Sequence, residues 1–149
     1  MPETKEAENI LGRLIRAHEG CFDIERPFSA GALEFDAMAQ YHAQANRYVL
    51  MKRASIWEVS AHEYGLFKTL DCLDGGSLAR ITDTVRRSFI APLDIPKNHM
   101  VTYVDVLLIA CHCSLETRRQ LQRIRYRKNL ALGLKGWVDL SVALAVLED

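Results

Sequence analysis

Glu63 and its neighbour His62 are the first residues whose type and position could support chemistry. They lie in segment 56–69, where apolar and polar residues alternate as in a half-buried strand. Glu63 falls on the apolar face, and a carboxylate there is costly to bury unless it is paired. We therefore expect either a satisfied ion pair or a functional carboxylate tuned by burial. The candidate counter-charges come from the neighbouring strand: Arg47, Lys52 or Arg53.

Asp36, Glu58 and Glu63 could together form a catalytic set of strand carboxylates. The order of elements around them is similar to that of the restriction-endonuclease-like nucleases, which hold a divalent metal between acidic residues. In those enzymes a lysine two residues after the last acid helps to activate water. Ser60 and Gly65 stand at the corresponding positions here, so the pattern is incomplete. A metal-dependent hydrolase or nuclease is therefore the alternative function.

Histidines give a third kind of candidate. His99 precedes an apolar strand and could be an acid–base group or a polar ligand contact, or could close a local hydrogen bond. His42, His62 and His99 could form a metal set if three strand ends meet, but no ligand-like spacing supports it. The four cysteines match no zinc pattern and are expected to be reduced, mostly buried thiols. We expect no metal and no cofactor.

The stretch Arg118–Lys128 contains six basic residues, whereas residues 1–40 carry eight acids and four bases. On a predicted helix over 115–126, Arg119, Arg123 and Arg127 would project outward. Such a surface could bind phosphates or nucleic acid, contact a protein, or face solvent. The formal net charge is zero, which makes nucleic acid an unlikely partner.

Composition limits the class of protein. The chain has 149 residues, 49% of them apolar and 26% charged, as in an ordinary globular domain. One domain over residues 1–149 can bury a core without disulfides. No apolar run approaches the ~20 residues that span a bilayer, and the N-terminus is polar. We therefore expect a cytoplasmic protein without a membrane segment.

Hydrophobic periodicity predicts the elements that position these residues. Alternation along 33–43 predicts one strand with Leu33, Phe35, Ala37 and Ala39 on a single face. Segment 100–113 is apolar on both faces, which is typical of a central strand. The expected helices are 4–18, 77–89 (capped by Ser77) and 115–126; the expected strands are 33–43, 47–52, 56–69, 100–113, 130–134 and 137–147, with a loop over 23–31. This order predicts a single-domain α+β fold with a mixed or mostly antiparallel sheet of four to six strands and about three packed helices.

Four short stretches carry a family resemblance: Arg47–Lys52; His62-Glu63-Tyr64 with Phe67; Asn98-His99-Met100 with Thr102-Tyr103; and Lys135-Gly136-Trp137. Together they resemble a family of short bacterial proteins known only as a domain of unknown function. The resemblance covers the chain from about residue 5 onward. It implies a stand-alone bacterial α+β domain and brings no reaction, cofactor or catalytic residue.

From these features we expect a small accessory domain that binds a ligand or partner, rather than an enzyme. The partner would be a second copy of the chain, as in a homodimer, or another protein; a small ligand is possible, and no membrane is involved. The candidate binding residues are Arg47, Lys52, His62, Glu63, His99, Arg119, Arg123 and Arg127.

Overall fold

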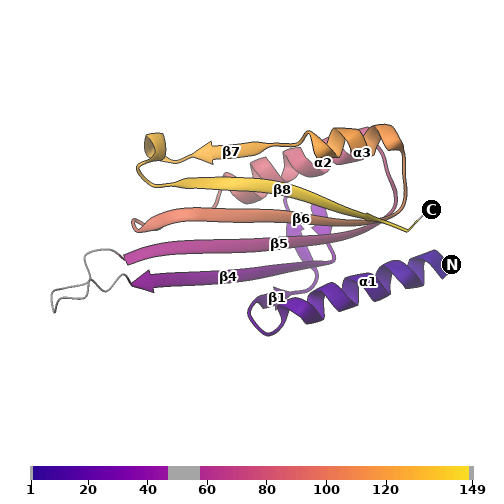
Figure 1. Ribbon diagram of the computed structural model, residues 1–149, viewed down its shortest axis with the longest axis horizontal. Coiled ribbons are helices and arrows are strands. Elements are labelled where there is room, and N and C mark those ends of the chain that lie inside the picture. The colour runs from indigo at the N-terminus through magenta and orange to yellow at the C-terminus, as the bar shows by residue number, and fades with distance from the viewer. Residues whose placement is uncertain (1, 47–57, 148–149) are drawn as a thin grey trace.

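A computed structural model describes residues 2–46 and 58–147 of the chain. The expected strand 47–52, with Arg47 and Lys52, lies outside the described residues, as does Arg53. The described part forms a single α+β domain with a mixed sheet, which confirms the predicted fold class (Figure 1).

The main sheet has six strands in the order β1-β4-β5-β6-β8-β7. Strands β5, β6 and β8 run parallel to one another, whereas β1, β4 and β7 pair antiparallel with their neighbours. β6 is the buried central strand that its two apolar faces predicted. The bounds are β1 Asp23–Glu25, β4 Ala37–Asn46, β5 Glu58–Leu73, β6 His99–Cys113, β7 Tyr126–Asn129 and β8 Trp137–Val146; β2 Phe28–Ala30 and β3 Leu33–Phe35 form a separate two-stranded ribbon.

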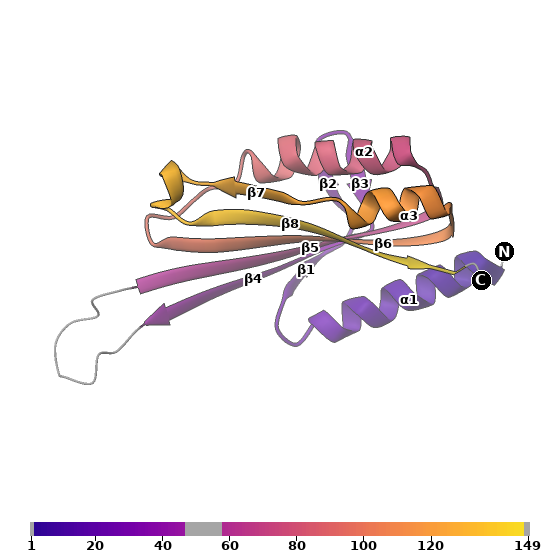
Figure 2. The same ribbon diagram turned by 45° about the horizontal axis from the view of Figure 1, so that its top comes forward.

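Helices cover the two faces of the sheet unequally (Figure 2). Helix α1, Pro2–His18, lies on one face. Helix α2, Gly75–Thr84, continues into a π-helical turn over Val85–Ile90 and lies on the other face, with α3, Leu115–Gln122, and the β2–β3 ribbon. The larger core therefore forms beneath α2, and a smaller core forms beneath α1.

Helices α2 and α3, which follow β5 and β6 respectively, each begin with a side-chain cap. Ser114 accepts a hydrogen bond from the backbone N–H of Thr117 at 3.1 Å, as expected for α3. In α2 the cap is Asp74, which accepts from the N–H of Ser77 at 2.7 Å. The prediction that Ser77 caps this helix was therefore wrong, because the carboxylate three residues earlier takes that role and Gly75 begins the helix.

The predicted strand 33–43 is divided at Asp36, and the division changes which face the residues meet. Leu33 and Phe35 belong to the core beneath α2, whereas Ala37 and Ala39 belong to the core beneath α1. Asp36 fixes the break, because its carboxylate accepts hydrogen bonds from the N–H and hydroxyl of Thr69 at 2.6 and 2.9 Å. The single face predicted from alternation was therefore wrong.

The C-terminal third also departs from the prediction. Helix α3 ends at Gln122 and a strand begins at Tyr126, so the predicted end of this helix at residue 126 was wrong. Segment 130–134 is a turn rather than a strand, with a short 3-10 helix at Ala131–Gly133. Likewise, the predicted loop 23–31 contains the short strands β1 and β2.

Within the described part of the chain, none of the helices has the length and apolar character needed to cross a membrane.

Candidate functional site

A row of polar and aromatic side chains crosses the sheet on the face that carries α1. The strand register places Tyr41, Glu63, Tyr103, Asp139 and Arg127 next to one another on five successive strands. Neighbouring strands lie about 4.7–4.9 Å apart, so adjacent members are within side-chain contact. We call these five residues the open row.

The open row lies beyond the part of the sheet that α1 covers. Beneath the helix, Phe67 and Ile109 are almost completely buried. On the same face, Tyr41 and Tyr103 keep 41% and 44% of their surface exposed. The sheet therefore presents a covered apolar half and an uncovered polar half on one face.

Glu63 lies between the two exposed tyrosines and is partly exposed. Among the described residues its carboxylate has no hydrogen-bond or ion-pair partner. The counter-charges expected from Arg47 or Lys52 belong to the segment that the structure does not describe. Glu63 is therefore an available carboxylate on an accessible face, flanked by Tyr41 and Tyr103.

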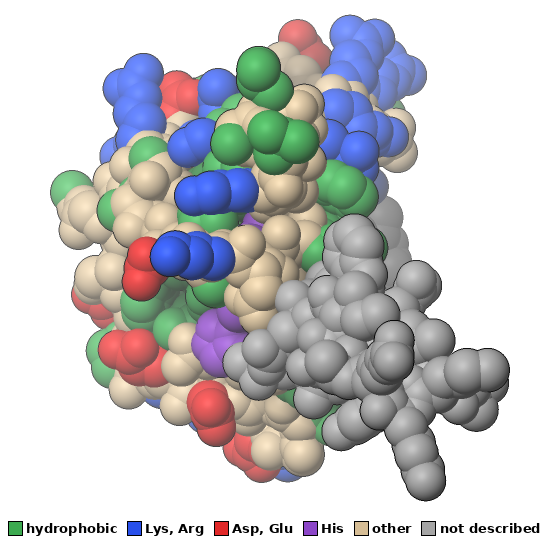
Figure 3. Space-filling view, turned by 90° about the vertical axis from the view of Figure 1, so that its left-hand side faces the viewer, with side chains coloured by type: hydrophobic (Ala, Val, Ile, Leu, Met, Phe, Trp, Pro, Cys, Tyr) green, Lys and Arg blue, Asp and Glu red, His purple; other side chains and the backbone are tan. Residues whose placement is uncertain are grey.

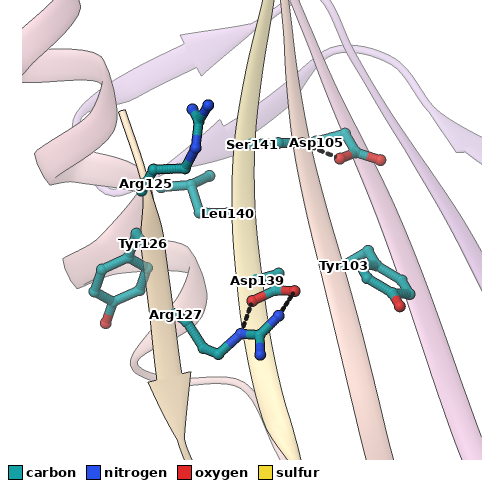
Figure 4. A pocket seen from close by; sticks show the side chains of 8 residues that line it. All are labelled: Tyr103, Asp105, Arg125, Tyr126, Arg127, Asp139, Leu140 and Ser141. Atoms are coloured by element: carbon teal, nitrogen blue, oxygen red, sulfur yellow. Dashed lines mark hydrogen bonds and ion pairs between the residues drawn. The ribbon is translucent and has the colours of Figure 1, made fainter. Parts of the chain in front are cut away.

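The other end of the open row is internally neutralised. Arg127 donates from Nε and Nη2 to the carboxylate of Asp139 at 2.6 and 2.9 Å (Figure 4). These hydrogen bonds raise the pKa of Arg127. The guanidinium also lies over the ring of Trp137, with its Cζ 4.9 Å from the ring centre. A bidentate pair of this kind fixes both side chains, so neither is a free charge.

A shallow cavity of about 490 Å³ opens beside this ion pair. That volume is within the range of small-molecule sites. Two residues along β6 and β8 from Tyr103 and Asp139, Ser141 donates a hydrogen bond to Asp105 (Figure 4). The lining residues are Tyr103, Asp105, Arg125, Tyr126, Arg127, Asp139, Leu140 and Ser141. Both carboxylates in the lining are therefore already engaged.

The predicted basic surface is divided between two elements. Arg119 lies on α3 and Arg123 directly follows it, and both are exposed. Arg127 instead lies on β7 and pairs with Asp139, because the helix ends five residues before it. The prediction that Arg127 projects outward from the same helix as Arg119 and Arg123 was therefore wrong.

Histidines gather on the opposite face of the sheet. His42 lies directly across from His62 on the neighbouring strand, with the two Nδ1 atoms 2.5 Å apart. The rings of His62 and His99 stack in parallel at 5.9 Å. Figure 3, which looks onto the end of the sheet where β6 begins, shows histidine at the surface. The structure thus brings together three histidines that sequence spacing did not connect.

His99 is 5% exposed and uses both ring nitrogens internally. Its Nδ1 donates to the carbonyl oxygen of Lys135 at 2.6 Å, and its Nε2 accepts from the hydroxyl of Thr102 at 2.7 Å. These contacts match the local hydrogen-bonding alternative rather than an acid–base role. His99 joins the start of β6 to the turn before β8.

His62 has a different environment from His99. Its Nε2 lies 3.2 Å from the hydroxyl of Ser60, and its Nδ1 points to His42. Burial, followed by the nearby His42 and His99, lowers the pKa of His62. The neutral imidazole is therefore favoured in the folded chain.

The carboxylates proposed for a nuclease site do not come together. Asp36 bonds to Thr69, which is six strand residues from Glu63, or about 20 Å at the rise of a strand. Glu58 begins β5, and its side chain is not described. Among described residues, no group of three or more histidine, cysteine, aspartate or glutamate side chains is arranged to hold a metal ion.

Sequence alternation identified Glu63 and His62 but missed their neighbours. Tyr41 and Tyr103 lie on strands that were correctly expected, yet the open row depends on how four strand pairs are aligned. Asp139 lies on the expected strand 137–147, but nothing in the sequence singled it out. Strand register, which a single sequence does not reveal, was the missing information.

A model of a protein family described as "Domain of unknown function (DUF8052)" matches residues 6–149. Comparison with curated proteins and with solved structures finds no match.

Proposed function

This chain belongs to the DUF8052 family of unknown function, and we propose that it is a binding domain that receives a cationic group on the open row. The observation that carries the proposal is the unpaired Glu63 carboxylate between two exposed tyrosines. The site would act by recognition rather than by catalysis.

The chemistry of the open row favours a positive ligand group. A guanidinium or ammonium ion on Glu63 would gain charge attraction, which for an exposed pair is worth about 0–1 kcal/mol. A ring within about 6 Å adds a cation–π term of roughly 0.5–1 kcal/mol at exposed sites. Tyr41 also packs against Phe22 at 5.6 Å, so one wall of the site is held in place.

The neighbouring charges leave Glu63 as the point of attachment. Within the open row, Asp139 is paired with Arg127. Asp105 lies two residues along β6 from Tyr103, outside the open row, and its hydrogen bond from Ser141 supplies no counter-charge. A cation that arrives at the open row therefore meets one uncompensated carboxylate. An anionic ligand would meet unfavourable charge at the same position.

We propose that the cation comes from a second copy of the chain, which makes the protein a homodimer. Arg119 and Arg123 are exposed and, among the described residues, their guanidinium groups have no hydrogen-bond or ion-pair partner. A free anion and free cations on one chain make its surface complementary to itself. In Figure 3, Lys and Arg side chains gather mostly in the upper half and Asp and Glu mostly in the lower half.

The compartment that we propose is the bacterial cytoplasm. The family resemblance suggests a bacterial origin, and a reducing compartment would keep the four free cysteines as thiols.

Self-association measured by analytical ultracentrifugation tests the proposal. We expect a monomer–dimer equilibrium that weakens with salt, and a roughly fivefold weaker dimer for Glu63→Gln, which corresponds to about 1 kcal/mol. Glu34→Gln is the matched control, because Glu34 is exposed on the separate β2–β3 ribbon. Arg119→Gln combined with Arg123→Gln should weaken the dimer as Glu63→Gln does.

A titration with arginine methyl ester, followed by NMR, separates the site from its partner. Shifts of Tyr41 and Tyr103 signals that disappear in Glu63→Gln support cation recognition. If the wild-type dimer is absent, such shifts would move the proposal from a homodimer to another cationic partner. An absence of both dimer and shifts would refute the proposed function.

A further inference from the structure

We propose that His42 and His62 form a binding site for a divalent transition-metal cation, on the face of the sheet opposite the open row. The two residues are direct cross-strand partners on β4 and β5. Their Nδ1 atoms point toward each other at 2.5 Å. This site is independent of the cation-binding function proposed for Glu63.

The protonation of the pair supports a metal site. Two nitrogens at this distance can share one proton but cannot both carry one, so at least one Nδ1 presents a lone pair. The hydroxyl of Ser60, which is almost completely buried, can accept the Nε2 proton of His62. A histidine ligand usually donates its second N–H in this way, which orients the ring and fixes its tautomer. When the proton of His42 moves from Nδ1 to its exposed Nε2, both rings stay neutral and the two Nδ1 atoms present lone pairs to one ion.

The geometry requires only a small adjustment. Metal–imidazole bonds of about 2.0–2.1 Å at a tetrahedral angle place the two nitrogens about 3.3 Å apart. The rings must therefore separate by less than ~1 Å. His42 is exposed, so its ring can turn outward to make this room and to admit the ion.

The third histidine supports the site without entering it. Both nitrogens of His99 are used by Lys135 and Thr102, and its ring stacks on that of His62. This contact holds the His62 ring in place. Two protein ligands leave the remaining coordination positions to water, as in an open metal site.

The donor atoms determine which cations should bind. Imidazole nitrogen suits Zn²⁺, Ni²⁺ and Cu²⁺, whereas Mg²⁺ and Ca²⁺ prefer oxygen ligands.

Calorimetric titration of the tag-free chain with ZnCl₂, NiCl₂ and MgCl₂ tests the site. Cys21 and Cys72 are exposed thiols that could bind zinc themselves, so the parent protein carries Cys21→Ser and Cys72→Ser. We expect one saturable event with Zn²⁺ and Ni²⁺ and none with Mg²⁺. His42→Gln and His62→Gln should each weaken it at least tenfold, whereas His112→Gln at the far end of β6 should leave it unchanged.

Paramagnetic Ni²⁺ provides a second readout that does not depend on the variants folding perfectly. In the parent protein, imidazole NMR signals of His42 and His62 should broaden first, ahead of those of His112. Equal Ni²⁺ affinity in all three histidine variants would overturn the proposal. So would a lack of binding up to millimolar Zn²⁺ and Ni²⁺, or broadening that begins elsewhere.

Discussion

Gly136 is the position where the fold tolerates a side chain least. It has a φ of +76°, and a Cβ added there would lie 1.7 Å from the carbonyl oxygen of Met100, where ordinary contact begins near 3.4 Å. Because the obstructing atoms of Met100 belong to the backbone and cannot turn away, a Gly136→Ala substitution must push the starts of β6 and β8 apart.

The cost can be worked out from the contacts that would be disturbed. The left-handed conformation costs alanine about 1–2 kcal/mol. Displacing the turn from the start of β6 also weakens two hydrogen bonds. One runs from the N–H of Leu130 to the carbonyl oxygen of Gly136 at 2.9 Å, and the other from Nδ1 of His99 to the carbonyl oxygen of Lys135 at 2.6 Å. Each is worth roughly 0.5–1.5 kcal/mol. We expect a total loss of about 2–5 kcal/mol in the free energy of unfolding.

Gly133 in the same turn is the matched control. Its φ is +87°, but a Cβ there would meet nothing within 4 Å. Gly133→Ala should therefore cost only the conformational term, about 1–2 kcal/mol. The two variants should differ by roughly 1–3 kcal/mol, or about 1 M in urea midpoint.

Urea unfolding followed by far-UV circular dichroism and tryptophan fluorescence measures both variants. Trp137 adjoins the substituted residue, so a native spectrum would show that the turn is retained. Equal midpoints for Gly133→Ala and Gly136→Ala would refute the argument that the approach to Met100 constrains this turn.

Three further predictions concern the histidine pair, the core beneath α1 and the contact between Asp36 and Thr69. The pKa of His62 is lowered by burial and then by neighbouring histidines, so the unfolded chain binds a proton on this side chain more readily than the folded chain does. The urea midpoint should therefore fall as the pH drops from above 6.5 through the pKa of His62 in the folded chain. The fall should be less steep in His62→Gln. Phe67→Ala should cost about 3–5 kcal/mol in thermal or urea unfolding, because Phe67 is fully buried beneath α1. Asp36→Ala should cost about 2–4 kcal/mol by the same assay, because two hydrogen bonds to Thr69 are lost; Thr69→Val, which keeps the N–H, should cost less.

Most of the fold could be predicted from local pattern. The amphipathic stripe of residues 4–18, the two-sided apolar run of 100–113 and the alternation of 137–147 correspond to α1, β6 and β8. The break at Asp36 was missed because alternation continues through it in the sequence. Only the contact with Thr69, far along the chain, shows that the strand turns over there.

The candidate site was less predictable because it depends on register. Glu63 stood out as a carboxylate on an apolar strand face, and it is indeed on the face shared with Phe67. Its position between Tyr41 and Tyr103 follows from two strand pairings, one antiparallel and one parallel. The contact of His42 with His62 has the same origin.

The unequal covering of the sheet follows from the handedness of its connections. The parallel strands β5, β6 and β8 follow one another in the same direction across the sheet, and β7, formed between β6 and β8, adds an antiparallel edge strand. Right-handed crossovers made in one direction place every connecting helix on the same side, which is where α2 and α3 lie (Figure 2). Within the described chain, the reverse side has a single helix to shield it. The exposed polar half is thus a result of chain topology, and substitutions within it can change what it recognises while the fold keeps its architecture.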